Sequence, residues 1–129
     1  MLQNNYSASE TQFMCDVCSE AIINPLCPFC LNTEIEAWLT FYPNLGEELL
    51  PRIKKYLHQI NNFSRNSTAC IRCNSKRASV CPYCFTEFVL DELKKIHASR
   101  IILKEFFQFF NFDFDHTGYS KEAERLGLI

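Results

Sequence analysis

Apolar residues recur three or four positions apart in three stretches of this 129-residue chain. That spacing is typical of helices that bury one face. The first stretch follows Cys30, the second lies in the middle of the chain, and the third follows Cys84. We therefore predict three main helices, whose apolar stripes are Leu31, Ile35, Trp38, Leu39 and Tyr42; then Leu45, Leu49, Ile53, Tyr56, Leu57 and Ile60; then Phe85, Phe88, Val89, Leu93 and Ile96.

Prolines and polar caps suggest where these helices begin and end. For the first helix we expect a cap at Asn32 or Thr33 and an end before Pro43. Pro51 interrupts the second stripe, so that helix either kinks at Pro51 or begins afresh there. The third stripe meets neither Pro nor Gly, and its helix is expected to run on to about Asn111.

All eight cysteines fall into four Cys-x-x-Cys pairs, and the pairs form two similar blocks. Each block reads Cys-x-x-Cys, a short loop, then Cys-Pro-aromatic-Cys and a predicted helix, and the second repeats the first at an offset of about 55 residues. Two such pairs in succession favour a tetrahedral zinc ion with four thiolate ligands. The predicted ligands are Cys15, Cys18, Cys27 and Cys30 in site 1, and Cys70, Cys73, Cys81 and Cys84 in site 2.

Other chemistries and one other pairing are open from the sequence alone. Paired thiolates also hold iron, as a single rubredoxin-like ion or as an iron–sulfur cluster. Four disulfides would fit the cysteine count, but the N-terminal residues show no secretory signal, and reducing compartments favour thiolate ligands. A cross-brace as in RING domains would join the first cysteine pair to the third and the second to the fourth, although the gap from Cys30 to Cys70 is long for that pattern.

The order of knuckle, short hairpin, second cysteine pair and helix resembles a treble-clef zinc finger, over residues 15–42 and 70–97. The Cys-Pro-x-Cys turns also resemble rubredoxin knuckles, except that Ser19, Leu31, Asn74 and Phe85 stand where those usually have Gly. The resemblance implies a small, metal-stabilised, α-rich (α+β) fold with two treble-clef-like fingers joined by a helical connector. It also implies that the last two ligands of each finger lie at the first turn of a helix.

These patterns divide the chain into five segments, which we expect to pack as one compact domain. So short a chain buries little apolar surface, and metal binding is expected to supply part of its stability. The segments are a flexible tail at 1–13, zinc finger 1 at 14–42, a helical connector and loop at 43–69, zinc finger 2 with a long Phe-rich helix at 70–112, and a tail with a short helix at 113–129.

Charge is distributed unevenly along the chain. Residues 1–51 contain seven acidic residues and no Lys or Arg, whereas residues 52–108 contain eleven basic residues and four acidic ones. Either the two halves attract each other within the fold, or the basic half faces an anionic partner. Candidate contacts to nucleic acid or to an acidic partner are Arg72, Lys76 and Arg77, in the hairpin of the second finger.

Six phenylalanines crowd into residues 106–114. So many aromatic side chains either fill the core or leave an apolar patch for a partner, which can be a second copy of the chain. The candidate interface residues are Phe106, Phe107, Phe109 and Phe110.

The sequence favours a non-enzymatic, cytoplasmic adaptor that uses two Zn²⁺ ions for structure and binds another protein. The alternatives are a nucleic-acid-binding zinc-finger protein and an iron protein in electron transfer. We find no catalytic constellation, no phosphate-binding glycine loop and no apolar run long enough to span a membrane. No small-molecule substrate is inferred.

Overall fold

The computed structural model describes residues 14–19, 22, 25–63 and 67–110. Within these ranges the chain forms four helices and one two-stranded antiparallel sheet. The helices are α2 (Pro28–Leu39), α3 (Pro43–Phe63), α4 (Pro82–Lys95) and α5 (Arg100–Phe109), and the strands are β1 (Thr68–Ala69) and β2 (Lys76–Ala78). The expected tails at 1–13 and 113–129 lie outside the described residues.

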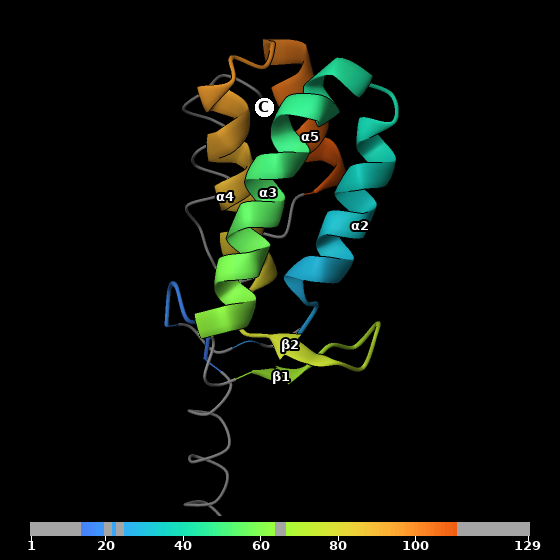
Figure 1. The fold of residues 1–129 in the computed structure, drawn as a ribbon. Helices are drawn as coiled ribbons and strands as arrows, with labels where there is room; N and C mark the ends of the chain where they lie inside the picture. The colour runs from blue at the N-terminus through green and yellow to red at the C-terminus, as the bar shows by residue number, and fades with distance from the viewer. Residues whose placement is uncertain (1–13, 20–21, 23–24, 64–66, 111–129) are drawn as a thin grey trace, which may run out of the picture.

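The helices form a bundle and the small sheet lies at one end of it (Figure 1). β1 pairs with β2 through Thr68 opposite Ala78 and Ala69 opposite Lys76, with an irregularity between these two pairs. None of the described helices combines the length and the apolar character that crossing a lipid bilayer requires.

The two helices that follow the cysteine blocks begin alike. Cys27 caps α2 and Cys81 caps α4, and a proline follows each cap at the first helical position. Proline suits that position because its missing N–H would have no partner there and its φ is already helical. The expected caps Asn32 and Thr33 are therefore wrong, since both lie inside α2.

The connector is one helix. α3 begins at Pro43 and continues through Pro51 to Phe63, so Pro51 does not start a new helix as the second expected alternative required. The predicted apolar stripe is confirmed, because Leu49, Ile53 and Leu57 are buried.

The long helix predicted up to Asn111 is wrong, because the chain turns between α4 and α5. His97 has a positive φ of 60°, which a right-handed helix cannot contain. Ser99 then caps α5 by accepting a hydrogen bond from the N–H of Ile102 at 3.2 Å. A serine at the N-cap position favours the start of a new helix.

The core joins the apolar faces of all four described helices. Trp38 of α2 packs its ring against Phe106 and Phe110, with ring centroids 5.6 and 5.8 Å away. Its indole N–H donates to Glu105 Oε1 at 2.7 Å, and the Tyr42 hydroxyl donates to the same oxygen at 2.9 Å. The fully buried side chains include Leu31, Ile35, Leu49, Ile53, Phe85, Val80, Val89, Leu90, Leu93 and Phe106.

Three of the four candidate interface phenylalanines belong to this core. Phe106, Phe107 and Phe110 are at most 6% exposed, whereas Phe109 is 64% exposed. Burial removes the first three from any surface that the folded chain presents. Phe109 remains available, as does Ile101 two turns earlier on α5, which is 76% exposed.

Candidate metal centres

The eight cysteines gather into two groups of four, but not within the two sequence blocks. The first pair joins the last, and the second pair joins the third. The expected grouping within blocks is therefore wrong, and the RING-like order is not adopted either. The groups are Cys15, Cys18, Cys81 and Cys84, called the outer site from here on, and Cys27, Cys30, Cys70 and Cys73, called the inner site.

The sulfur positions fit one tetrahedral ion in each site. All four sulfurs of a site lie within 4.8 Å of one another. The Sγ–Sγ distances are 3.9 Å for Cys18–Cys81, 3.7 Å for Cys27–Cys73 and 3.8 Å for Cys30–Cys70. Four ligands at about 2.3 Å from a zinc ion lie about 3.8 Å apart at the corners of a tetrahedron. All eight cysteines are free, which excludes the disulfide alternative in this structure.

Each site combines a knuckle from one repeat with a helix start from the other. In the outer site the Cys15–Cys18 knuckle faces the first turn of α4, which carries Cys84 and begins after Cys81. In the inner site the Cys70–Cys73 knuckle faces the first turn of α2. The two repeats have therefore exchanged knuckles, although each keeps its own local shape.

The exchange is fixed by a matched pair of backbone hydrogen bonds. The N–H of Cys27 donates to Cys70 Sγ at 3.3 Å, and the N–H of Cys81 donates to Cys15 Sγ at 3.3 Å. Within each helix start, Cys30 N–H donates to Cys27 Sγ and Cys84 N–H donates to Cys81 Sγ, both at 3.4 Å. Such N–H groups stabilise a thiolate, as does the partial positive charge of the helix N-terminus.

The two knuckles are also alike. Val17 N–H donates to Cys15 Sγ at 3.4 Å, and Arg72 N–H donates to Cys70 Sγ at 3.3 Å. The residue after each knuckle, Ser19 or Asn74, has a positive φ of 63° or 61°. This is the conformation that favours glycine, so Ser19 and Asn74 stand in the glycine positions of a rubredoxin-like knuckle.

Close packing of the thiols moves their pKa values in opposite directions. In the outer site, hydrogen bonds from Cys81 and Cys84 lower the pKa of Cys15, while the bond to Cys15 raises the pKa of Cys81 to about 12. In the inner site, the N–H of Ser75 lowers the pKa of Cys73 to about 6. Burial raises the pKa of the Tyr56 hydroxyl to about 12, and the negative charge of Cys84 adds to this effect.

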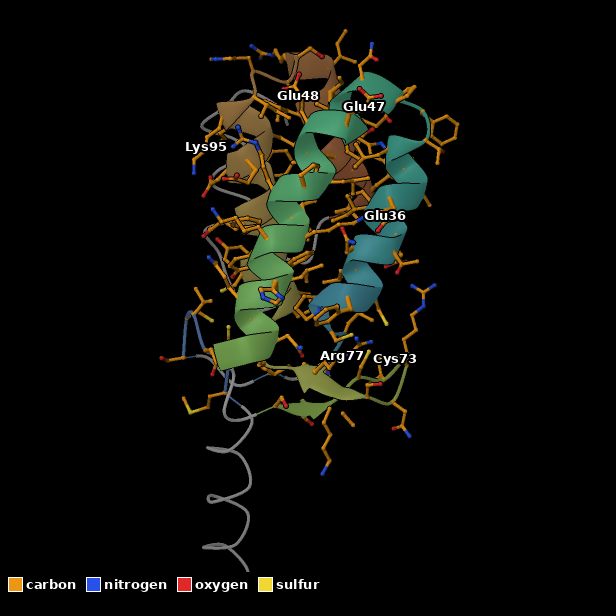
Figure 2. The ribbon with its side chains drawn as sticks, viewed as in Figure 1. Glu36, Glu47, Glu48, Cys73, Arg77 and Lys95 are labelled. Atoms are coloured by element: carbon orange, nitrogen blue, oxygen red, sulfur yellow. The ribbon has the colours of Figure 1, made fainter. Side chains whose placement is uncertain are left out.

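The two sites differ in exposure and in neighbouring charge. Three ligands of the outer site are buried, whereas Cys73 of the inner site is exposed. The guanidinium of Arg77 reaches the inner site, with Nη2 3.9 Å from Cys73 Sγ (Figure 2). It also stacks over the Phe29 ring, at 4.2 Å from the ring centroid. The sulfurs of this site, Cys73 first, raise the pKa of Arg77.

The basic hairpin is thus partly used within the fold. Arg72 pairs with Glu34 at 3.2 Å, which joins the basic half of the chain to the acidic half. Arg77 faces the inner site, and Lys76 is exposed. The sequence pattern indicates Arg72, Lys76 and Arg77 as contacts for an external partner, but it indicates no role for Glu34 or Phe29.

The comparisons with known proteins place the chain in no family: no family model, no curated protein and no solved structure matches it. The fold and the sites therefore define its class by themselves. This is a small helical chain with two four-cysteine groups that could hold metal ions.

Proposed function

We propose that the chain is a non-enzymatic interaction module held in shape by two structural zinc ions. The observation that carries this proposal is the separation of 3.7–3.9 Å between sulfurs that come from opposite repeats. A structural zinc site is closed by four protein ligands, whereas a catalytic site keeps a position for water or substrate. Two sets of four thiolates leave no such position.

Zinc is preferred over iron for a geometric and a chemical reason. In an iron–sulfur cluster the thiolates bind different irons, and thiolates on different irons lie further apart than the edge of one tetrahedron. The sulfur separations therefore support one ion per site. A single iron would fit the same tetrahedron, but zinc is the usual ion of small Cys₄ domains in reducing compartments.

Elemental analysis of the purified chain tests this assignment. We expect about two zinc atoms per chain and a colourless protein. Iron in place of zinc, with visible thiolate-to-iron absorbance, would replace the interaction module with the electron-transfer alternative. A ratio near one would mean that one site does not fill.

The proposed partner surface lies on α5. We expect it to bind another protein or a second copy of the chain. Ile101 and Phe109 are 76% and 64% exposed on a helix whose other aromatic residues are buried. Large exposed apolar side chains of this kind serve as anchors at protein interfaces.

Sedimentation and thermal unfolding test this surface together. The double variant Ile101→Ser and Phe109→Ser should lose association and change its melting temperature little, because both side chains are largely exposed. Phe106→Ala is the matched comparison, because it removes a buried ring and should lower the stability by about 3 kcal/mol or more. If Ile101→Ser/Phe109→Ser leaves the association of the chain unchanged, α5 is not the partner surface.

A further inference from the structure

The inner site has one cysteine that solvent reaches readily. All eight cysteines lie within the described ranges, and Cys73 is the exposed one, whereas the others are buried or partly buried. Its sulfur lies at the protein surface, while the sulfurs of Cys15, Cys81 and Cys84 are surrounded by protein. A small molecule in solution can therefore reach Cys73 more easily than any other member of the two sites.

The surroundings of Cys73 also favour its reactive form. A metal ligand is a thiolate, and the thiolate rather than the thiol is the form that attacks an oxidant. The guanidinium of Arg77 adds to this effect, because its Nη2 lies 3.9 Å from Cys73 Sγ (Figure 2). Cys73 thus combines exposure with thiolate character, the two properties that make a cysteine sensitive to oxidation.

A second sulfur lies close enough to react with an oxidised Cys73. Cys27 Sγ is 3.7 Å from Cys73 Sγ. A disulfide bond needs the two sulfurs at about 2.05 Å, so a small movement of one residue is sufficient. Residues 71–76, which include Cys73, are all exposed, whereas Cys27 is buried. The movement is therefore expected on the Cys73 side, where little packing opposes it.

We propose that Cys73 is a modification site at which hydrogen peroxide, or another hydroperoxide, opens the inner site by forming a disulfide bond between Cys73 and Cys27. This inference rests on the zinc ions of the proposed function, because it concerns the release of one of them. It goes beyond that function by giving the inner site a reaction of its own.

The reaction has two steps. Cys73 Sγ attacks one oxygen of the peroxide, the O–O bond breaks, and the products are a sulfenic acid on Cys73 and a hydroxide ion. Cys27 Sγ then attacks the sulfenic sulfur, so that an S–S bond forms and a second hydroxide ion leaves. The two thiolates lose two electrons, the peroxide gains them, and two protons from solvent convert both hydroxide ions to water.

The disulfide leaves the inner site with two thiolates, those of Cys30 and Cys70. Two ligands do not close a structural zinc site, so the inner zinc ion should leave. The outer site should respond more slowly, because three of its four cysteines are buried. The chain should therefore pass through a form that holds one zinc ion and one disulfide bond.

The test is treatment of the zinc-loaded full chain with hydrogen peroxide, followed with a coloured zinc indicator. The zinc content is measured before peroxide is added, which separates a failure of the zinc assignment from a failure of the oxidation site. We expect the first zinc ion to leave faster than the second by on the order of tenfold. Dithiothreitol with added zinc should restore the inner site, because a disulfide is reducible and a sulfinic acid is not.

Trypsin and mass spectrometry locate the disulfide bond after the first zinc ion has left. Cleavage after Arg72 and Lys76 isolates Cys73 in fragment 73–76, apart from every other cysteine. Cys27 lies in fragment 1–52, which contains no internal Lys or Arg. The disulfide should join these two fragments, and sequencing of the joined fragment should place the partner at Cys27.

Cys73→His is the variant that removes the reactive sulfur and keeps a metal ligand, because zinc accepts imidazole in place of a thiolate. It should bind two zinc ions, and its faster zinc release in peroxide should slow by on the order of tenfold. Cys18→His makes the same exchange in the outer site, at the least buried of its four cysteines, and is the matched control. It should keep the fast release of the native chain.

Three results would overturn the proposal. They are a first disulfide bond within the outer site, release of both zinc ions at one rate, and oxidation of Cys73 to a sulfinic acid without a disulfide. A disulfide bond from Cys73 to Cys30 or Cys70 would refute Cys27 as the partner. The native chain alone decides among these outcomes, so the proposal stays testable even if Cys73→His binds a single zinc ion.

Discussion

The N–H of Cys27 donates to the sulfur of Cys70 at 3.3 Å, across 43 residues of sequence. This bond joins a helix start of the first repeat to a knuckle of the second. Its counterpart joins Cys81 to Cys15 with the same length. The two four-cysteine sites are therefore nested in the sequence: all four cysteines of the inner site lie between Cys18 and Cys81 of the outer site.

This nesting predicts which double cysteine substitutions damage one four-cysteine site and which damage both. Cys15→Ser with Cys84→Ser damages only the outer site, so that variant should keep about one tetrathiolate ion per chain. Cys15→Ser with Cys30→Ser removes one ligand from each site and should leave no complete tetrathiolate ion. Both variants lose two thiols, so each controls for the other.

Cobalt substitution provides the measurement, because the intensity of thiolate-to-cobalt absorbance reports how many complete sites remain. If the sites were instead formed within the sequence blocks, the result would be reversed. Cys15→Ser/Cys84→Ser would then disturb both sites and Cys15→Ser/Cys30→Ser only one. This reversal would refute the exchanged arrangement.

Exchange of knuckles also predicts how the two halves of the chain behave when they are separated. Residues 1–63 and 67–129 each carry four cysteines, but in the structure each half supplies two ligands to each site. Neither half should form its native sites alone, and the mixture should form a one-to-one complex with two zinc ions per pair. Sedimentation with zinc analysis measures this. Halves that each fold as monomers with one tightly held zinc ion would contradict it.

The sequence predicted the features that depend on neighbouring residues and missed those that depend on distant ones. The apolar stripes of α2, α3 and α4 are confirmed because helical periodicity is local. The pairing was missed because the two repeats offer the same knuckles and the same helix starts, so either knuckle fits either helix. Contacts between segments far apart in the sequence determine which knuckle reaches which helix, and helical periodicity does not report them.

The break between α4 and α5 was missed for a different reason. The absence of Pro and Gly predicts a continuous helix, but Ser99 supplies a cap and His97 adopts a left-handed backbone conformation. The exposure of Phe109 and the burial of Phe106 follow from the new helix, because its direction decides which aromatic residues meet Trp38.

An ion pair between the half-exposed Arg52 of α3 and the buried Glu92 of α4 makes a further contribution to the acid sensitivity of the fold. Glu92 is 7% exposed and lies 3.1 Å from Arg52 and 2.9 Å from Lys95. Burial raises the pKa of Glu92, but the bonds from Lys95 and Arg52 outweigh it and leave the pKa below its usual value. A lowered folded pKa contributes stability that is present above the unfolded pKa and is lost as pH falls through the folded one.

Glu92→Gln should therefore destabilise the zinc-loaded chain by about 1–3 kcal/mol at pH 7 and by the same amount at pH 5. The native chain and the variant should lose stability in parallel between these pH values, because protonation of the thiolate ligands releases zinc from both. Glu48→Gln, on the exposed surface near the start of α3 (Figure 2), should change stability by less than about 0.5 kcal/mol. Denaturant unfolding at several pH values measures these differences. A deficit of Glu92→Gln that disappears already between pH 7 and 5 would show that the Glu92 pKa is not lowered.

The unequal surroundings of the two sites predict that the inner site releases its zinc first. Cys73 is exposed there, and Arg77 supplies the charge that offsets the thiolates from a distance of 3.9 Å. Arg77→Ala should weaken zinc binding at the inner site by about tenfold or more, as loss of a group that supports a metal ligand commonly does. The outer site should be unaffected, and Lys76→Gln, on the same strand, should leave both sites unchanged. Competition with a chelator is the measurement: the native chain should release two zinc ions in separate phases, and only the faster phase should accelerate in Arg77→Ala. A single phase for both ions, or acceleration of the slower one, would show that Arg77 does not distinguish the two sites.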